Sequence, residues 1–304
     1  MKKNFIKLTK DLIPDPLLRI AQHVQAYTRR MQAERAVAVF RKKEGKPHGL
    51  PGELIVSLTS YPPRYHCLAK TILSLLMQDM RPDRIVLWLA EGPENAPPPD
   101  VLDLQSKGLE IRYCDDIRSY KKIIYSLQNF PNSFIVTADD DLYYEDKWLR
   151  TIVSGFDDKF PTIVCRRAHR PKLRDSQLAP YEEWDQDVIC DDIEHCIFPT
   201  TGAGALFPPN SLAPDVTERS IFLELCPYAD DVWLFVMALR AGSRFKQVGG
   251  GFPQITWEKS QATSLLQHNL GERGNDRQLS AVISRYCEDP LIQAALASLH
   301  SKDA

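Results

Sequence analysis

The sequence lacks the features that define several common protein classes. Its seven cysteines are odd in number and scattered, and none forms a C-x-x-C pair. This argues against a disulfide framework and a standard zinc site, so we expect reduced thiols. No stretch approaches the roughly 18 apolar residues of a membrane span. Lys, Asp and Pro also interrupt the apolar positions of residues 1–16, unlike a signal-peptide core. We therefore expect a soluble, cytoplasmic protein.

Internal repeats, low-complexity tracts and the phosphate-binding pattern G-x-x-x-x-G-K-[ST] are absent as well. The 304 residues are 43% hydrophobic and 26% charged, which suits one large globular core. Residues 1–50 carry 12 Lys and Arg against 4 Asp and Glu, a net charge of +8 that leaves −10 for the remainder. The acidic body argues against nucleic-acid binding.

The basic N-terminal segment contains a helical pattern. Apolar residues recur in steps of three and four at Leu17, Ile20, Val24, Tyr27 and Met31, with Arg29, Arg30 and Arg35 nearby. This spacing predicts an amphipathic basic helix. Three partners stay open for it: the main body, a second copy of the chain, or an anionic membrane surface reached through residues 1–45. We expect residues 1–50 to form this extension and a Gly- and Pro-containing linker.

Short β-rich runs alternate with helical ones after residue 52. The expected strands cover 53–58, 84–89, 109–113, 133–138 and 161–165, and helices are expected near 67–79, from about 120, and over 230–241. Alternation of this kind predicts an α/β fold with a doubly wound, mostly parallel sheet flanked by helices. We expect this main domain to cover 51–288, with a C-terminal helix and tail over 289–304.

Polar segments follow three of the expected strands, at 57–64, 115–122 and 139–141. Ligands of doubly wound sheets bind beyond the carboxyl ends of the strands, so we expect these segments to meet at one edge. Three adjacent carboxylates, Asp139, Asp140 and Asp141, would repel one another there and call for a compensating cation. A hard ion such as Mg²⁺ or Mn²⁺ fits carboxylate and phosphate oxygens. The alternative is a solvated acidic loop that caps the next helix.

Six segments, taken in order, resemble bacterial glycosyltransferases of the GT-A class, family-2-like, that build surface polysaccharides such as lipopolysaccharide and capsule. They are SLTSYPPR (57–64), SYKKIIYSL (119–127), TADDDLYY (137–144), FPTTGAGALFPP (198–209), YADDVWLF (228–235) and GNDRQL (274–279). The likeness spans about residues 53–285 and leaves out the basic arm. It implies a GT-A-like fold and a nucleotide-sugar co-substrate.

The resemblance also implies how the donor would be bound. Thr59, Tyr61 and Arg64 correspond to the loop that contacts base, ribose or phosphate, and Lys122 corresponds to a lysine near the nucleotide. From the residues alone, the charges of 115–122 could equally be a solvated helix start.

The metal-binding role falls on the aspartate run, which corresponds to the DxD motif. The resemblance implies that Asp139 and Asp140 contact ribose or sugar and that Asp141 ligates Mn²⁺ or Mg²⁺, with Asp139 as a further ligand. His268 is a candidate to complete the metal shell, although a surface histidine is the alternative.

The pair Asp230-Asp231 corresponds to the acidic pair that supplies the catalytic base. If transfer inverts the anomeric centre, one carboxylate must take the acceptor hydroxyl's proton. The resemblance makes Asp231 the first choice and Asp230 the second. This chain has Ala229-Asp230-Asp231 where many relatives carry Glu-Asp, so the choice between the two aspartates stays open. The alternative is a helix cap.

Other candidates have a weaker basis. Arg166, Arg167, His169 and Arg170 could bind phosphate or an anionic acceptor, or form a solvated loop. Residues 190–196 hold metal-ligand types at no zinc spacing, so a structural or acceptor-loop role is favoured. Trp233 and Trp257 could stack on sugar or lie in the core.

The sequence therefore predicts a metal-dependent, inverting glycosyltransferase. The expected donor is a UDP-sugar and the expected acceptor a glycan or lipid-linked glycan, at the inner face of the cytoplasmic membrane. Two alternatives stay open: a metal-dependent nucleotidyltransferase or phosphodiesterase, and a non-catalytic carbohydrate-binding protein on the same scaffold.

Overall fold

The computed structural model of the chain describes residues 15–41, 44–175, 177–190, 192–260 and 274–300. Within these ranges one seven-stranded sheet has the order β11-β5-β10-β4-β1-β2-β3. Its strands are β1 (Leu54–Thr59), β2 (Arg84–Ala90), β3 (Leu109–Cys114), β4 (Phe134–Thr137), β5 (Thr162–Cys165), β10 (Ala205–Phe207) and β11 (Arg244–Gln247). Neighbours run parallel, except that β10 is antiparallel to β4 and β5. The predicted α/β fold with a mostly parallel sheet is confirmed.

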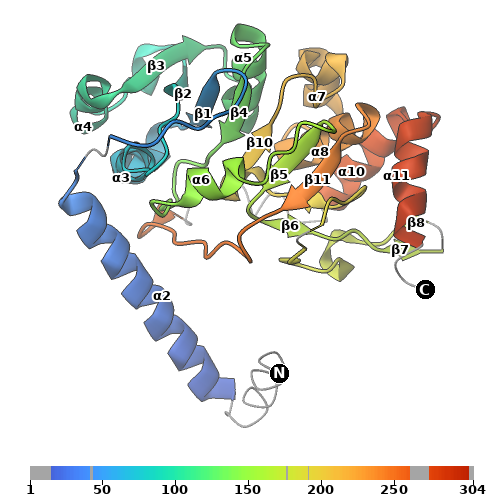
Figure 1. Ribbon diagram of the computed structural model, residues 1–304, viewed down its shortest axis with the longest axis horizontal. Helices are drawn as coiled ribbons and strands as arrows, with labels where there is room; N and C mark the ends of the chain where they lie inside the picture. Colours follow the sequence, from blue (N-terminus) through green and yellow to red (C-terminus); the bar gives the residue numbers. More distant parts are fainter. Residues whose placement is uncertain (1–14, 42–43, 176, 191, 261–273, 301–304) are drawn as a thin grey trace.

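Helices cover both faces of this sheet (Figure 1). Alternate strand residues enter different cores: Phe134 and Val136 of β4 pack on one face, and Ile135 on the other. The first face is covered by α3 (Tyr65–Leu76), α4 (Pro99–Leu102) and α6 (Trp148–Val153). The second is covered by α5 (Lys121–Asn129), α7 (Arg219–Leu225), α8 (Asp230–Arg240), α10 (Gly274–Arg285) and α11 (Pro290–His300). Because both faces are buried, the central strands are almost wholly apolar.

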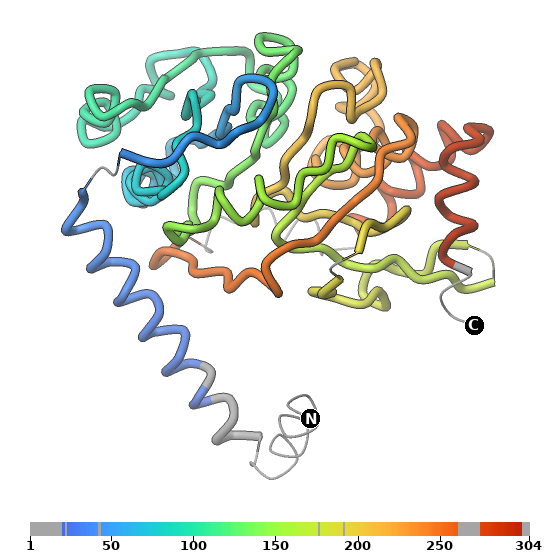
Figure 2. The backbone as a smooth tube through the Cα atoms, viewed as in Figure 1, coloured from blue at the N-terminus to red at the C-terminus, as the bar shows by residue number. Residues whose placement is uncertain are grey.

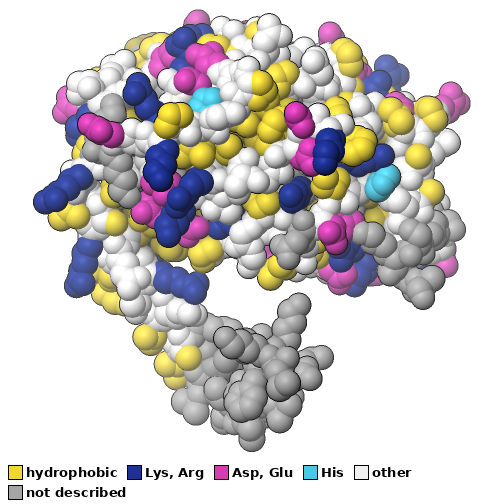
Figure 3. Space-filling model, in the orientation of Figure 1, with side chains coloured by type: hydrophobic (Ala, Val, Ile, Leu, Met, Phe, Trp, Pro, Cys, Tyr) yellow, Lys and Arg dark blue, Asp and Glu magenta, His cyan; other side chains and the backbone are white. Residues whose placement is uncertain are grey.

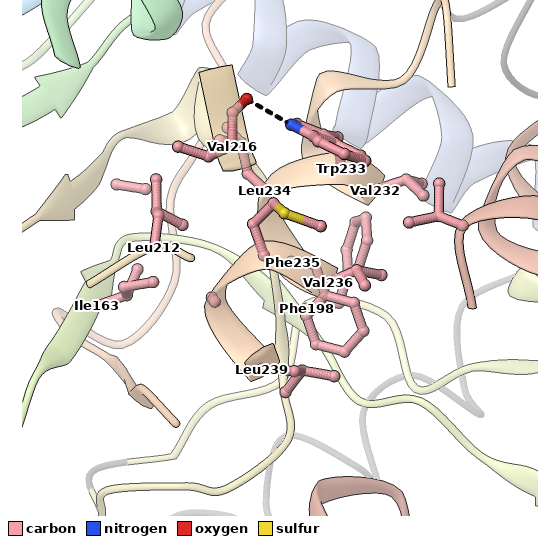
Figure 4. Close-up of a cluster of buried hydrophobic side chains, with 14 of the residues drawn as sticks. Ile163, Phe198, Leu212, Val216, Val232, Trp233, Leu234, Phe235, Val236 and Leu239 are labelled. Atoms are coloured by element: carbon pink, nitrogen blue, oxygen red, sulfur yellow. Dashed lines mark hydrogen bonds between the residues drawn. The ribbon is translucent and has the colours of Figure 1, made fainter. Parts of the chain in front are cut away.

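The helix α8 is buried nearly all round and carries a large part of the core (Figure 4). Trp233 is fully buried there, and its indole N–H donates to the carbonyl of Val216 at 2.9 Å. Trp257 is also buried, and its indole N–H donates to Thr71 Oγ1 at 2.8 Å. The sugar-stacking interpretation of these two residues is therefore wrong, because each ring lies in the interior with its polar atom satisfied.

The sequence-based assignments recover the first four strands, β5, α3, α5 and α8 within a few residues. They omit β10, whose three residues are too few to show a period, and β11, whose four residues (Arg244–Gln247) include only one apolar side chain. Two short pairs are also present, β6 (Ala168–His169) with β9 (Phe198–Pro199) and β7 (Leu173–Arg174) with β8 (Gln177–Leu178). All seven cysteines are free, as expected.

The predicted N-terminal helix is α2 (Asp15–Ala38), which projects from the body (Figures 1 and 2). Its last turns pack against the body, where Ala33 and Val37 are buried in one cluster with Cys67 and Trp257. No helix in the described ranges combines the length and apolar character that a bilayer crossing needs. The proposed domain boundaries after residues 50 and 288 stay predictions.

Candidate active site

A cleft of about 630 Å³ opens where β1, β3 and β4 end. The three polar segments expected at this edge line it, together with 200–203 and 228–231. It contains nine predicted site residues: Thr59, Tyr61, Arg64, Lys122, Asp139, Asp140, Asp141, Asp230 and Asp231. The tenth, His268, lies outside the described residues. The predicted meeting of distant segments is thus found, while the role of each residue stays a prediction.

Arg64 faces two of the three aspartates. It ends the short turn η1 (Pro62–Arg64) that follows β1, and its Nη1 lies 2.5 Å from Asp141 Oδ2 and 3.5 Å from Asp140 Oδ1. Burial lowers the pKa of Arg64, but the two carboxylates raise it above its ordinary value. Ser60 Oγ also donates to Asp140 Oδ2 at 2.5 Å. A guanidinium therefore compensates Asp140 and Asp141.

Lys122 compensates the remaining carboxylates. It lies in the first turn of α5, is 4% exposed, and places Nζ 2.7 Å from Asp139 Oδ1 and 3.1 Å from Asp230 Oδ2. Burial lowers the pKa of Lys122, yet Asp139, Asp230 and Asp231 together raise it above the ordinary lysine value. The lysine is therefore charged and connects the aspartate run to the start of α8.

Two members of the aspartate run are buried. Asp140 and Asp141 are 9% and 6% exposed, and the next helix, α6, begins only at Trp148. Burial raises the pKa of Asp140 to about 7 against the lowering effect of Arg64 and Ser60. The alternative of a solvated, helix-capping loop is therefore wrong, because such a loop would leave these carboxylates in water.

Asp139 is positioned by residues that the sequence did not single out. The backbone N–H of Asp139 donates to the hydroxyl of Tyr144 at 2.7 Å, and that hydroxyl donates to the carbonyl of Gly202 at 2.6 Å. A Cβ atom at Gly202 would lie 2.0 Å from Asp139 Oδ2. Residue 202 must therefore be glycine for Asp139 to keep this place. The sequence signal for this position was the glycine-containing segment TTGAG (200–204), but the sequence did not indicate which contact requires Gly202.

Asp231 is held by the turn η6 (Thr201–Ala203). The backbone N–H and hydroxyl of Thr201 donate to Asp231 Oδ1 at 3.0 and 2.5 Å. Burial and then the charge of Asp230 raise the pKa of Asp231, Lys122 and Thr201 lower it, and the result is about 6. A carboxyl with this pKa is suited to general-base work near neutrality. The N-cap of α8 is Ala229 and no side chain caps it, so neither aspartate is a helix cap, whereas both lie in the first turn, where they complement the helix dipole.

The donor set around the aspartates fits a hard cation in ligand type. Asp139 and Asp141 offer carboxylate oxygens, which Mg²⁺ and Mn²⁺ prefer over nitrogen or sulfur. Across the described ranges, no three His, Cys, Asp or Glu side chains are grouped as a metal site. Among the described residues, Asp139 and Asp141 are therefore the two that could hold such an ion.

Comparisons with known proteins give distant structural similarities only. No protein-family model matches the chain, and no curated protein matches it. The inositol-1-phosphate CTP transferase from T. maritima is 11% identical over 76% of this chain and 96% of that chain, with a TM-score of 0.40. Mannosyltransferase PcManGT from Pyrobaculum calidifontis, in complex with GDP-Man and Mn²⁺, is 14% identical over 94% and 86%, at 0.41. S. aureus TarS 1-349 is 11% identical over 78% and 72%, at 0.41. At these values, none of these similarities bears on activity.

A layer beneath the aspartate run fixes its backbone. Thr71 Oγ1 donates to the carbonyl of Asp140 at 2.9 Å, and the backbone N–H of Trp257 donates to the carbonyl of Asp141 at 3.1 Å. The thiol of Cys67 lies 3.3 Å from the carbonyl oxygen of Arg64 and 3.8 Å from that of Asp140. Burial raises the pKa of this thiol to about 12. The helix α3 thus supports both sides of the Arg64–aspartate contact.

The basic segment after β5 is only partly in the cleft. Arg167 lines it and pairs with Asp187 at 2.5 Å, whereas Arg166 is buried and donates to the carbonyl of Val248 at 3.0 Å. His169 is buried, and burial followed by the charge of Arg167 lowers its pKa to about 4. Both the phosphate-binding and the solvated-loop interpretations are wrong for Arg166 and His169, because neither side chain reaches ligand or solvent.

The remaining weak candidates lie at the rim or beyond it. Asp116 lines the cleft and pairs with Lys121 at 2.5 Å, whereas Asp115 pairs with Arg219 at 2.8 Å. Of residues 190–196, the described part contributes to no grouped metal site. Its favoured structural role agrees with Glu194, which exchanges backbone hydrogen bonds with Phe245.

Proposed function

We propose that this chain is a metal-dependent glycosyltransferase that uses a nucleotide sugar, with UDP-sugars as the first donors to test. The acceptor would be a glycan or lipid-linked glycan of surface polysaccharide synthesis, at the inner face of the cytoplasmic membrane. One observation carries the proposal. A carboxyl with a pKa of about 6, Asp231, shares a cleft with a partly buried aspartate run that is compensated by Arg64 and Lys122.

The proposed reaction assigns separate tasks to the two ends of the cleft. Asp231 takes the proton of the acceptor hydroxyl while that oxygen attacks the anomeric carbon. The bond from this carbon to the diphosphate breaks, and its electron pair leaves with the diphosphate, which inverts the anomeric centre. Arg64 and Lys122 line the cleft, so their positive charges can stabilise the diphosphate as its charge grows. A divalent ion held by Asp139 and Asp141 would supply further charge stabilisation to the leaving group.

Thr201 supports the choice of Asp231 over Asp230 as the base. Its two donors hold one carboxylate oxygen of Asp231, which keeps the group oriented. Asp230 instead lies 3.1 Å from Lys122, so its carboxylate is engaged by that ammonium group. The role that we propose for Asp230 is therefore to orient Lys122.

A nucleotidyltransferase is the second candidate, because paired cations beside an aspartate run would also suit a triphosphate. The two reactions differ in products: glycosyl transfer releases a nucleoside diphosphate, whereas nucleotidyl transfer releases pyrophosphate. A non-catalytic carbohydrate-binding protein is less well supported, since sugar binding alone requires no carboxyl poised near neutrality.

The first test is a thermal-shift panel of nucleotides and nucleotide sugars with and without Mn²⁺. A ligand that binds only the native state, at a free concentration of about 100 times its Kd, stabilises that state by about 2.7 kcal/mol. We expect metal-dependent stabilisation by one nucleotide sugar, followed by release of the nucleoside diphosphate when acceptor is added. Stabilisation by a nucleoside triphosphate with release of pyrophosphate would contradict the proposal.

A further inference from the structure

The helix α2 carries an exposed apolar stripe. Ile20, Val24, Tyr27 and Met31 are 59%, 59%, 58% and 36% exposed. Their spacing of four, three and four residues places them on one narrow face of the helix. Figure 3 shows hydrophobic side chains together with basic ones along this projecting helix. Large apolar side chains gathered on one exposed face indicate a partner rather than chance exposure.

The part of the body that the structure describes does not provide that partner. The face of α2 that touches the body contains Ala33 and Val37, which are 1% and 6% exposed. At 3.6 residues per turn, this face lies roughly 130° around the axis from the stripe. Glu34, which pairs with Lys70 at 2.7 Å, helps to fix the rotation of the helix. The stripe therefore points away from the body in the packed position of α2.

The charge around the stripe favours an anionic surface. Arg30 and Arg35 lie on either side of Met31 in the sequence, and residues 1–14 add four lysines against one aspartate. The whole segment 1–50 carries a net charge of +8. A helix with one apolar face and excess positive charge lies in the headgroup region of a bilayer that contains anionic lipid.

A second copy of the chain fits the stripe less well. In a parallel pair of helices joined along the stripe, the flanking positions would bring Arg30 of one copy against Arg35 of the other. Like charges at these positions oppose pairing. An anionic bilayer turns the same two charges into attractive contacts.

We propose that α2 anchors this protein to an anionic membrane surface, with Ile20, Val24 and Tyr27 directed toward the acyl chains. The packing of the last turns of α2 then has a consequence for the cleft. Ala33 and Val37 pack with Trp257, whose backbone N–H holds the carbonyl of Asp141. Anchoring therefore fixes the orientation of the aspartate run relative to the membrane. This last step rests on the proposed function, since it favours an acceptor carried by a lipid.

The test uses the full-length protein and vesicles of phosphatidylcholine with or without phosphatidylglycerol. We expect about tenfold or tighter binding to the anionic vesicles, lost at high salt. The double variant Val24→Asp with Tyr27→Asp should bind at least about tenfold more weakly than the wild type. The matched control, Gln25→Asp with Gln32→Asp, adds the same charge at exposed positions outside the stripe and should lose much less. Equal losses in both variants, or no preference for anionic vesicles, would overturn the proposal.

Two further measurements separate the other outcomes. Sedimentation equilibrium of the wild type tests pairing with a second copy of the chain. If the wild type is a dimer that does not bind vesicles, and the double variant Val24→Asp with Tyr27→Asp is a monomer, then a second copy and not the membrane covers the stripe. Donor binding without vesicles should be unchanged in both double variants, because the stripe lies outside the cleft. A chain that binds vesicles but no nucleotide sugar would refute the proposed function and leave the anchor standing.

Discussion

The ammonium nitrogen of Lys122 lies 2.7 Å from a carboxylate oxygen of Asp139. The same nitrogen lies 3.1 Å from Asp230, so one buried cation holds the segment after β4 against the start of α8. Removing one partner of a buried ion pair leaves an uncompensated charge, which costs more than the pair contributes.

The substitution Lys122→Met should therefore destabilise the protein by about 3 kcal/mol. We expect the lower part of the usual range, because the side chain of Asp139 is 42% exposed and water can hydrate it. Urea unfolding monitored by circular dichroism measures the change. The matched control is Lys121→Met: its partner, Asp116, is 63% exposed, so the loss should stay below about 1 kcal/mol. Equal losses would contradict the role given to Lys122.

The variant Asp231→Asn tests the base. Asparagine keeps the shape of the side chain but cannot accept the acceptor proton, so we expect kcat to fall about a hundredfold or more. Donor affinity, measured by calorimetry, should stay nearly constant. The neighbouring change Asp230→Asn serves as the comparison and should affect donor binding through Lys122. If Asp231→Asn turns over normally, the base lies elsewhere.

The pH dependence of the reaction follows from the raised pKa of Asp231. The base acts in its ionised form, so activity should rise with pH through about 6 and level off above it. Initial rates between about pH 5 and pH 8 measure this profile in kcat/KM. An ascending limb near the ordinary aspartate pKa of about 4 would show that Asp231 is not the titrating group.

Gly202→Ala tests the position of Asp139. The new methyl group would lie 2.0 Å from Asp139 Oδ2, so the carboxylate must move and its contact with Lys122 weaken. We expect weaker donor binding in the presence of Mn²⁺ with the sheet intact. Gly52→Ala is the control, because its Cβ would meet its nearest atom at 3.2 Å, away from the cleft. Unchanged donor affinity for Gly202→Ala would argue against a role for Asp139 in binding.

Asp141→Ala tests the metal. If Asp141 is a ligand, the variant should lose both transfer activity and its response to added Mn²⁺, with an unchanged circular dichroism spectrum. Ser60→Ala is a useful comparison, because it removes a contact to Asp140 while leaving both proposed ligands in place. Full activity of Asp141→Ala in the presence of a chelator would reject metal dependence.

The strands that meet the cleft could be predicted because each is a short apolar run that ends in polar residues. The strand before Asp139 ends at Thr137, within one residue of expectation, and the cleft lies at the carboxyl ends as parallel topology requires. The antiparallel strand β10 could not be predicted. Its three residues pair only because β4 and β5 already flank it, which is a tertiary effect.

The pairing of charges inside the cleft was also beyond sequence reasoning. Residue types indicated that cations must compensate the aspartates, yet Arg64 faces Asp141 while Lys122 faces Asp139, across different sequence separations. Thr201 was missed for a related reason. A threonine in a loop is common, and only the folded position of α8 brings Asp231 to its two donors.

The reactivity of the Cys67 thiol reports on the opening of the structure around it. Its thiol is 1% exposed and lies between the backbone of Arg64 and that of Asp140. A thiol reagent can reach it only when this packing opens, either between α3 and the aspartate run or beneath the last turns of α2, whereas the exposed Cys287 reacts at once. The rate of labelling at Cys67 therefore measures how often the packing around this residue opens. A ligand that stabilises this packing would slow the labelling.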